Sequence, residues 1–485
     1  METTARRRGV PVGNLRALCS HGLTSLRVPA LEIASAGLIA CDGERAAAEA
    51  ISVVEGGVRI AGVEYPVAPG AKLIVLGAGK ATLPIATALE QALGDRIDGG
   101  AVILRRGETA SLERIEVFIA DHPLPSKASV RGALRLEELA DEVGPDDLVL
   151  ACFTGGSSAL ASHPPDGIPF EDKRSLHRAL LGAGMPIAEV NAVRKHVSTL
   201  KGGRLAARIA PARIVNLTVS DVAGDVLDVI TDPTVADSTT AADAVSVLRD
   251  YGLWDGLPES IVRHLNTAGA ESPDLTGADI RTELLVTGRS VCDAMEREAF
   301  AHGFQPLVLS TTIEGEAREM GRFVADLARS SSIADYPFGP GTVLLGCGGE
   351  NSVAIAEKGS FGDGGPGQEA AVSAATVLDG ANVVALFMDT DGSDGGTDAA
   401  GAVVDGHTVE RARELGLDLR RALLSHSSRE PLARLEDLIV TGATGTNVND
   451  LFVVAIGDSP DELPEPVSPG PLNSELRGAK HRGND

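Results

Sequence analysis

Short, almost wholly apolar runs recur along the chain, and each ends in glycine and polar residues. Apolar runs of about four to eight residues bounded by turn residues are typical of buried strands. In the first half they lie at 72–76, 101–104, 115–119, 148–153 and 213–219. In the second half they lie at 283–287, 306–309, 342–345, 383–388 and 451–456. The pattern therefore predicts strands distributed over both halves of the chain.

The segments between these runs place apolar residues three and four positions apart, which predicts helices. These segments are 28–50, 81–93, 126–142, 170–182, 186–200, 240–265, 291–301 and 315–328. In the first half the helix 126–142 separates the strands 115–119 and 148–153, and this βαβ pattern predicts a mostly parallel sheet. The alternation restarts in the second half, so the fold class is α/β with a second α/β domain. The polar, turn-rich stretch 266–279 is the best linker candidate. We therefore expect domains at 27–275 and 280–458, with 1–26 and 459–485 flexible.

Composition narrows the class of protein. A chain of 485 residues is long for one core, which agrees with two domains. Its 68 acidic and 43 basic residues give a net charge of −25, which disfavours nucleic acid and anionic membranes as partners. Basic residues that gather locally are thus candidates for binding an anion. The same acidity also fits an adaptation to high salt.

The five cysteines are widely spaced and contain no CxxC pair. They predict neither a disulfide framework nor a zinc site, and we expect a cytoplasmic protein with reduced thiols. No apolar run is long enough to span a bilayer.

The stretch 383–406 carries the strongest chemical signal. A buried strand ends there in carboxylates on a glycine-rich loop, at Asp389, Asp391 and Asp394. Carboxylates at the end of a strand can hold a metal ion at the edge of a sheet where α/β proteins bind ligands. A solvated acidic loop is the alternative. An EF-hand is excluded, because Asp394 stands where the loop needs glycine and Ala400 where it needs glutamate.

Two glycine turns in the first half follow predicted strands. In the first, Gly77 and Gly79 precede Lys80 and a helix, and free backbone N–H groups at a helix start bind anions. This turn completes neither a Walker A loop nor a dinucleotide fingerprint, and a plain turn with an exposed lysine remains possible. The second turn offers backbone and hydroxyl donors at Gly155, Gly156, Ser157 and Ser158, and it also allows the plain-turn interpretation.

Basic residues gather in the predicted helix 186–200 and just beyond it. Asn191, Arg194, Lys195, Ser198 and Lys201 are mostly three or four residues apart, so they are expected on neighbouring faces of one helix. Arginine grips a carboxylate or a phosphate with two hydrogen bonds. This local reversal of charge predicts an anion site, and a solvated helix face is the alternative.

Further polar loops adjoin strands. Asp221 follows the strand 213–219 and is a candidate metal ligand, base or cap, and Glu350, Gln368 and Asn447 lie in glycine- or threonine-rich loops of the second half. Each of these signals is weak alone.

Together these stretches resemble the glycerate 2-kinases of the MOFRL type. The resemblance rests on GAGKA, GGSSAL, EVNAVRKHVSTLKGGRLA, SDVAGD, GGENSV, GGPGQE, DTDGSDGGTDAAGAVVDG and TGTNVNDL, in this order from about residue 28 to 457. It implies an N-terminal Rossmann-like three-layer α/β sandwich, a C-terminal MOFRL α/β domain and an active site in the cleft between them. The chain departs from the family pattern at Ser157, Pro366 and Gly367, where glycine, arginine and asparagine are frequent.

The implied reaction transfers the γ-phosphoryl group of ATP to D-glycerate, with Mg²⁺, to give 2-phosphoglycerate and ADP. Lys80, Arg194 and Lys195 would then contact phosphate or carboxylate, and Asn191 and Lys201 would bind substrate. Asp221 would act as a base, and Asp389, Asp391 and Asp394 would hold Mg²⁺ or orient the nucleophile. The alternatives are an NAD(P)-dependent hydroxypyruvate reductase, a kinase of another small sugar acid, and a non-enzymatic sensor of sugar acids or nucleotides. We expect a monomer or homodimer.

Overall fold

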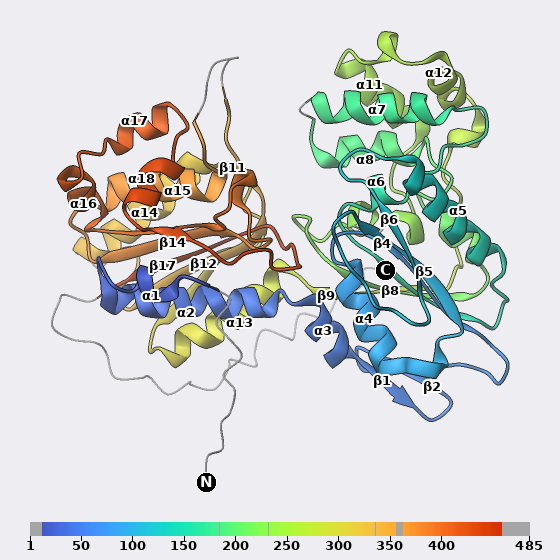
Figure 1. The fold of residues 1–485 in the computed structure, drawn as a ribbon, viewed down its shortest axis with the longest axis horizontal. Coiled ribbons are helices and arrows are strands. Elements are labelled where there is room, and N and C mark those ends of the chain that lie inside the picture. The colour runs from blue at the N-terminus through green and yellow to red at the C-terminus, as the bar shows by residue number, and fades with distance from the viewer. Residues whose placement is uncertain (1–11, 184, 231, 335, 356–361, 458–485) are drawn as a thin grey trace, which may run out of the picture.

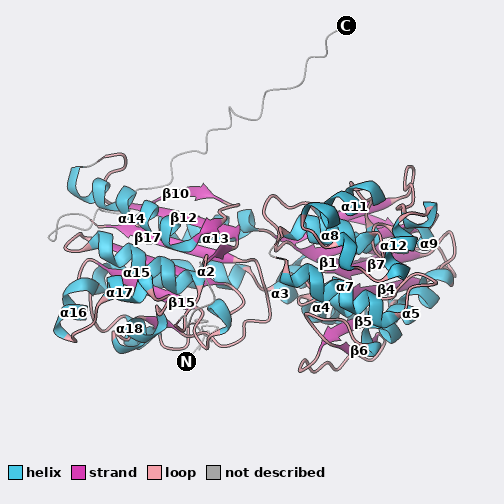
Figure 2. Ribbon diagram, turned by 90° about the horizontal axis from the view of Figure 1, so that it is seen from above, coloured by secondary structure: helices cyan, strands magenta, loops and turns pink. Residues whose placement is uncertain are grey.

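The computed structural model describes residues 12–183, 185–230, 232–334, 336–355 and 362–457. Two α/β lobes lie side by side, each built on a six-stranded sheet (Figures 1 and 2). A single buried apolar cluster includes residues of both sheets and of the N-terminal helices between them. The two lobes are therefore joined at their base by a continuous core.

The first lobe is built on a wholly parallel sheet. Its strands lie in the order β6 (Glu116–Ala120), β5 (Gly99–Arg105), β4 (Leu73–Ala78), β7 (Leu148–Phe153), β8 (Arg213–Val219) and β9 (Ile280–Val286). Every residue of β4 and β7 is buried, as expected for strands covered on both faces. Leu73 and Val75 pack into one core and Ile74 and Leu76 into another, so this lobe has three layers.

Helices cover both faces of this sheet. They are α3 (Gly43–Ala50), α4 (Thr82–Leu93), α5 (Lys127–Asp141), α6 (Ser157–Leu160), α9 (Arg204–Ile209) and α10 (Leu227–Ile230). A further group stands at one end of the lobe with its own apolar core, comprising α7 (Phe170–Gly182), α8 (Ile187–Lys195), α11 (Ala241–Asp250) and α12 (Glu259–Leu265) (Figure 1). A small antiparallel sheet contains β1 (Ile51–Val54), β2 (Gly57–Ile60) and β3 (Val63–Pro66).

The second lobe is built on a mixed sheet. Its order is β10 (Gln305–Ser310), β12 (Thr342–Gly349), β17 (Asp450–Ile456), β14 (Val383–Asp389), β15 (Gly401–Asp405) and β16 (Leu438–Ile439). Only β10 and β12 pair in parallel, and the other neighbours are antiparallel. The mostly parallel sheet expected from the βαβ pattern of the first half is therefore confirmed, and the second α/β lobe has a mixed sheet. Two short strands, β11 (Gly315–Glu316) and β13 (Asn351–Ser352), pair beside this sheet.

Two helix layers enclose the second sheet (Figure 1). On one face lie α2 (Thr24–Ala40) and α13 (Gly288–Ala301), and on the other lie α14 (Ala317–Ala334) and α15 (Pro366–Leu378). The remaining helices are α1 (Leu15–Leu18), α16 (Thr408–Glu414), α17 (Leu419–Leu424) and α18 (Arg429–Arg434).

The division between the lobes differs from the expected boundaries in two places. Strand β9, expected to open the second domain, is hydrogen-bonded to β8 at the edge of the first sheet. Helix α2, expected in the first domain, packs on α13, β14 and β17 of the second lobe. Strand pairing and long-range packing set the boundary here, and neither leaves a local mark on the sequence.

The N-terminal expectation of a flexible segment is wrong for the residues that the structure describes. Leu18 is fully buried and Leu26 is 3% exposed, and both lie within the segment expected to be flexible. The expected flexibility of 1–11 and 459–485 falls outside the described residues. In the described part of the chain no single helix is long and apolar enough to cross a bilayer, although the bent pair α2–α3 passes by length and composition.

The predicted helix 186–200 is shorter in the structure. It ends at Lys195, and Gly202 and Gly203 adopt positive φ before α9 begins. His196 is the C-cap residue, and its Nδ1 atom lies 2.8 Å from the backbone oxygen of Ala270. Ser198 and Lys201 therefore do not share a helix face with Arg194.

Candidate active site

The turns after β4 and β7 are tied together at the carboxyl edge of the first sheet. The backbone N–H of Lys80 donates to the oxygen of Gly155 at 2.8 Å, and that of Ala81 donates to the Thr154 hydroxyl at 3.1 Å. A Cβ on Gly79 would lie 2.1 Å from the Thr154 hydroxyl oxygen, so only glycine allows this approach. The side chain of Lys80 is half-buried and has no hydrogen-bond partner among the described residues.

Asp221 completes this edge from the turn after β8. A Cβ on Gly155 would lie 1.9 Å from its Oδ2 atom, so glycine is required for the carboxylate to lie here. Burial raises the pKa of Asp221, and the charge of Lys80 partly offsets this rise. The group is thus a carboxyl whose proton affinity exceeds the ordinary value, beside a lysine, at the edge where α/β sheets bind ligands.

The facing edge of the second lobe carries a pair of carboxylates. Asp389 ends β14 directly opposite Asp450, the first residue of β17. Burial, and then the like charge of Asp391, raise the pKa of Asp389 to about 8. Burial also raises the pKa of Asp450 to about 7, although the backbone and side chain of Asn351 donate to its Oδ2 atom at 2.8 and 2.9 Å. Such crowding is relieved when a cation binds.

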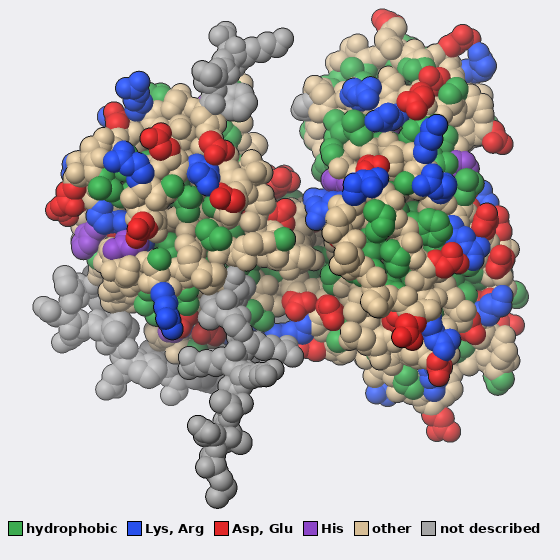
Figure 3. Space-filling view, in the orientation of Figure 1, with side chains coloured by type: hydrophobic (Ala, Val, Ile, Leu, Met, Phe, Trp, Pro, Cys, Tyr) green, Lys and Arg blue, Asp and Glu red, His purple; other side chains and the backbone are tan. Residues whose placement is uncertain are grey.

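A direct hydrogen bond joins the two edges. The Nδ2 atom of Asn449 donates to the backbone oxygen of Asp221 at 2.7 Å. Glu350, exposed at the end of β12, acts on both Asp221 and Asp450 through its charge. We call the set Lys80, Asp221, Glu350, Asp389 and Asp450 the interlobe site. Figure 3 shows the surface of the molecule hollowed between the two lobes.

The three aspartates expected to hold a metal do not form one cluster. Among the residues that the structure describes, no group of three His, Cys, Asp or Glu side chains is placed to hold a metal ion. Asp394 instead accepts the backbone N–H groups of Gly367 and Gln368 at 3.0 and 2.8 Å, at the start of α15. It caps a helix whose first N–H groups have no other partner. Asp391 stays beside Asp389, whose Oδ1 accepts its N–H at 2.8 Å.

Two expected cations are already paired with carboxylates. The Nζ atom of Lys195 lies 2.8 Å from Asp228 and 2.9 Å from Asp237. That of Lys201 lies 2.7 Å from Asp232, and both members of this pair are buried. The charge reversal expected from the sequence is therefore offset by aspartates that follow it in the chain. In this structure neither lysine is free to meet a substrate.

Arg194 and Asn191 lie on the same helix as Lys195, but each has a side-chain atom without a hydrogen-bond partner among the described residues. Arg194 is 7% exposed and Asn191 6% exposed. The Nε atom of Arg194 and the Oδ1 atom of Asn191 are buried without a hydrogen-bond partner. Burial lowers the pKa of Arg194 to about 10. Unpartnered buried polar atoms cost stability, so a ligand that satisfied them would be favoured.

The remaining expected site residues divide into two groups. Ser157, which is buried, and Ser158 begin α6, while Gly156 and Asn447 lie in loops. Gly77 lies inside β4, where a Cβ would meet Cys152, so close packing requires glycine there, and its contact with phosphate stays a prediction. Gln368 is fully buried and donates to the Thr397 hydroxyl at 2.9 Å, which supports the Asp394 loop.

Sequence reasoning missed Asp450 and undervalued Asn449. The Asn-Asp pair directly before the final apolar run was the available signal. Its significance depends on β17 running antiparallel beside β14, which brings the start of one strand to the end of the other. The local pattern does not show this pairing.

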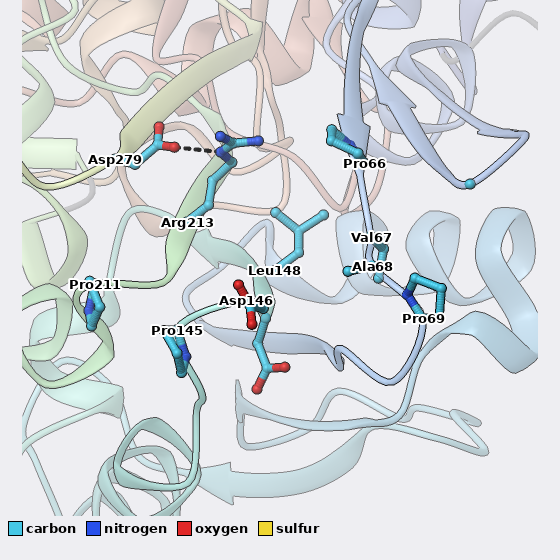
Figure 4. Close-up of a pocket in the computed structure, with 12 residues that line it drawn as sticks. Pro66, Val67, Ala68, Pro69, Pro145, Asp146, Leu148, Pro211, Arg213 and Asp279 are labelled. Atoms are coloured by element: carbon cyan, nitrogen blue, oxygen red, sulfur yellow. Dashed lines mark hydrogen bonds and ion pairs between the residues drawn. The ribbon is translucent and has the colours of Figure 1, made fainter.

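A cavity of about 550 Å³ lies elsewhere, at the opposite edge of the first sheet (Figure 4). Its lining is rich in proline and includes Pro66, Pro145 and Pro211. Its arginine, Arg213, is paired with Asp279 at 2.6 Å. Since its charged groups are engaged or point away from one another, it does not match the chemistry of the interlobe site.

Comparison with known proteins defines the class first. The family described as "Domain of unknown function (DUF4147)" matches residues 29–266, and the MOFRL family matches 343–450. A crystal structure of a Pyrococcus horikoshii protein aligns with a TM-score of 0.77 at 36% identity, covering 88% of this chain and 98% of that one. A glycerate kinase from Thermotoga maritima aligns equally well, at 35% identity and the same coverage. The class is a two-lobed MOFRL protein.

The relatives then identify the family. A glycerate 2-kinase from Pyrococcus horikoshii is 36% identical over 436 residues, which cover 89% of this chain and 97% of the relative. The D-glycerate 2-kinase of Thermotoga maritima is 38% identical over 79% of this chain and 90% of its own length. An Agrobacterium vitis protein with a provisional hydroxypyruvate reductase name is 39% identical over 81% of this chain. The chain belongs to the MOFRL-type glycerate kinase family.

Proposed function

We propose that this protein is an ATP-dependent glycerate 2-kinase that converts D-glycerate and ATP to 2-phosphoglycerate and ADP. The observation that carries the proposal is the Asn449–Asp221 hydrogen bond, because it sets the Lys80 edge of one lobe against the carboxylate pair of the other. Phosphoryl transfer needs positioning and neutralisation of negative charge more than covalent participation by the protein. The residues of the interlobe site can provide both the positioning and the neutralisation of charge.

Each residue of the first-lobe edge has a role in this scheme. Lys80, whose ammonium group is unpaired among the described residues, offsets the charge that spreads over the transferring phosphoryl group. The carboxylate of Asp221 accepts the proton of the substrate 2-hydroxyl. The hydroxyl oxygen then bonds to the γ-phosphorus as the bond from that phosphorus to the bridging oxygen breaks, and this oxygen leaves with ADP.

The second-lobe edge fits a divalent cation. Mg²⁺ is commonly held by one or two carboxylates together with substrate phosphates, so a full protein cage is unnecessary. Asp389 and Asp450 would hold it, since burial, and then neighbouring like charges, raise the pKa of both carboxyls, and a cation would offset both effects. When bound, the ion would neutralise phosphate charge. Asp394 is assigned to helix α15, and Lys195 and Lys201 are assigned to their ion pairs.

Release of ADP tests the proposal. Purified protein with ATP and Mg²⁺ should release ADP with D-glycerate, and far less with L-glycerate or lactate. ADP release with threonate in place of D-glycerate tests the alternative that the protein phosphorylates a longer sugar acid. Oxidation of a nicotinamide cofactor by hydroxypyruvate, followed by absorbance, tests the reductase. Reductase turnover without ADP release would overturn the kinase proposal.

The five cysteines are all free thiols, four of them buried. Unpaired cysteines support a reducing compartment, and we propose the cytoplasm.

A further inference from the structure

Three cations surround one histidine at the carboxyl edge of the first sheet, beside the interlobe site. His122 follows β6, Arg105 ends β5 and Lys80 follows β4, and these three strands are neighbours in the sheet. Arg194 approaches from α8. Such a gathering of positive charge is unexpected in a chain with a net charge of −25. Of these residues, only Lys80 has a role in the proposed function.

The geometry fixes His122 close to the glycine turn. A Cβ on Gly156 would lie 3.3 Å from both the Cδ2 and the Nε2 atoms of His122, and 3.3 Å from the Cγ atom of Lys80. The imidazole edge and the lysine stem therefore flank the same glycine. Its neighbour Asp121 does not supply a counter-charge to this group, because its carboxylate is paired with Arg106 at 2.7 Å.

The charged groups that act on His122 are Lys80, Arg105 and Arg194. Burial, and then these three cations in that order, lower its pKa to about 4. The imidazole is thus neutral at pH 7, with one nitrogen that donates and one that accepts. Among the described residues its ring has no hydrogen-bond partner, and the Nε atom of the 93%-buried Arg194 is also unpartnered. The cluster therefore offers hydrogen-bond donors that no described residue engages.

We propose that His122, Arg105, Arg194 and Lys80 form one subsite for an oxyanion, either the carboxylate of the hydroxy acid or a phosphate of the nucleotide. This assignment deepens the proposed function and rests on it. A bound oxyanion would accept hydrogen bonds from Arg194 and His122 and offset the repulsion among the cations. It would also favour a proton on His122, so binding would be coupled to proton uptake.

Calorimetric titration of the intact protein tests the subsite without requiring turnover. The probes are D-glycerate and inorganic pyrophosphate, titrated separately against wild type, Arg105→Gln, His122→Gln and the control Arg106→Gln. Arg106 is the matched control because it is adjacent in sequence, more exposed and paired with Asp121. The melting temperature of each variant verifies folding.

We expect Arg105→Gln and His122→Gln to lower the affinity for one of the two probes about tenfold. Arg106→Gln should bind both probes with the affinity of the wild type. If the variants bind D-glycerate more weakly, the subsite holds the carboxylate of the hydroxy acid. If they bind pyrophosphate more weakly, it holds a phosphate of the nucleotide. Titrations in buffers of different ionisation enthalpy should show proton uptake that His122→Gln reduces. The subsite is refuted if folded Arg105→Gln and His122→Gln bind both probes as the control does, whether or not the protein proves to be a glycerate kinase.

Discussion

At the scale of single residues, the interlobe site brings together a lysine that makes no ion pair with any described residue and two carboxyl groups that make none either. Lys80 is unpaired among the described residues, whereas Lys195 and Lys201 are held by aspartates. Asp389 and Asp450 face each other across two antiparallel strands. A folded protein keeps such uncompensated groups together at a cost in stability, and a charged ligand removes that cost.

Replacing Lys80 by Ala should lower kcat/KM for ATP-dependent turnover at least about 100-fold, because the transferring phosphoryl group loses its neutralising charge. The melting temperature should stay close to wild type, since the ammonium group makes no hydrogen bond or ion pair within the described structure. Steady-state kinetics and thermal unfolding measure the two effects. Lys72→Ala, at an exposed lysine, serves as control. A folded Lys80→Ala enzyme with full activity would remove the assigned role.

The raised pKa of the Asp389 carboxyl should make the stability of the protein depend on pH. Its carboxyl has a pKa of about 8 in the folded protein against an ordinary value of 3.8, so the folded state binds this proton more tightly. The free energy of unfolding therefore decreases as pH rises between these values. Asp389→Asn should raise the melting temperature at pH 8 without Mg²⁺ by about 2–4 °C.

Adding Mg²⁺ at pH 8 should stabilise the wild type and have a smaller effect on Asp389→Asn. Differential scanning calorimetry at pH 5 and pH 8 checks both statements, and the difference between wild type and variant should shrink at pH 5. A variant that is less stable than wild type at pH 8 would mean that the carboxylate is not under repulsion.

At the scale of elements, helix α2 is fixed to the second lobe by a buried charge cluster. Arg27 pairs with Asp405 and Asp437, and none of the three side chains is exposed. Burial acts to raise the pKa of Asp405, but the charge and hydrogen bond of Arg27 outweigh it and the pKa is lowered. Removing the arginine leaves Asp405 buried without its cation, whereas Asp437 keeps Arg411.

Arg27→Met should therefore destabilise the protein by about 3–5 kcal/mol. The exposed pair Arg45–Glu49 provides the comparison, because Arg45→Met should cost less than about 1 kcal/mol. Urea unfolding followed by circular dichroism measures both. Equal and small losses in the two variants would show that the cluster does not hold α2.

The local pattern of apolar residues predicted where most strands lie, but it did not predict which strands pair with one another. Apolar runs located β4, β7, β14 and β17, because each is almost wholly buried and leaves a nearly continuous apolar stretch. The pairing of β17 with β14 and the placement of β9 in the first sheet depend on contacts between distant segments. The same limit explains Lys195, whose spacing suggested a free cation until its partners Asp228 and Asp237 were known.

At the scale of the whole molecule, the two lobes share a core at their base, and the hydrogen bond from Asn449 to Asp221 joins the two edges of the interlobe site. Asn449 has a φ of 60°, a backbone conformation that asparagine and glycine tolerate. Asn449→Gly therefore removes the bond to Asp221 while keeping the backbone path. We expect kcat to fall about tenfold, in proportion to a lost hydrogen bond of ordinary strength. Steady-state kinetics with saturating ATP measures it, and an unchanged kcat would show that this contact does not position the site.

The central claim is that charges from two lobes meet so that a nucleotide can pass its terminal phosphoryl group to a small hydroxy acid. Phosphorus NMR of the product formed from ATP, Mg²⁺ and D-glycerate tests it most directly, with Lys80→Ala and Asp389→Asn as comparisons, one from each lobe. The account predicts a 2-phosphoglycerate signal from wild type and almost none from either variant. A signal of undiminished strength from both variants, or no phosphorylated acid from wild type, would contradict it.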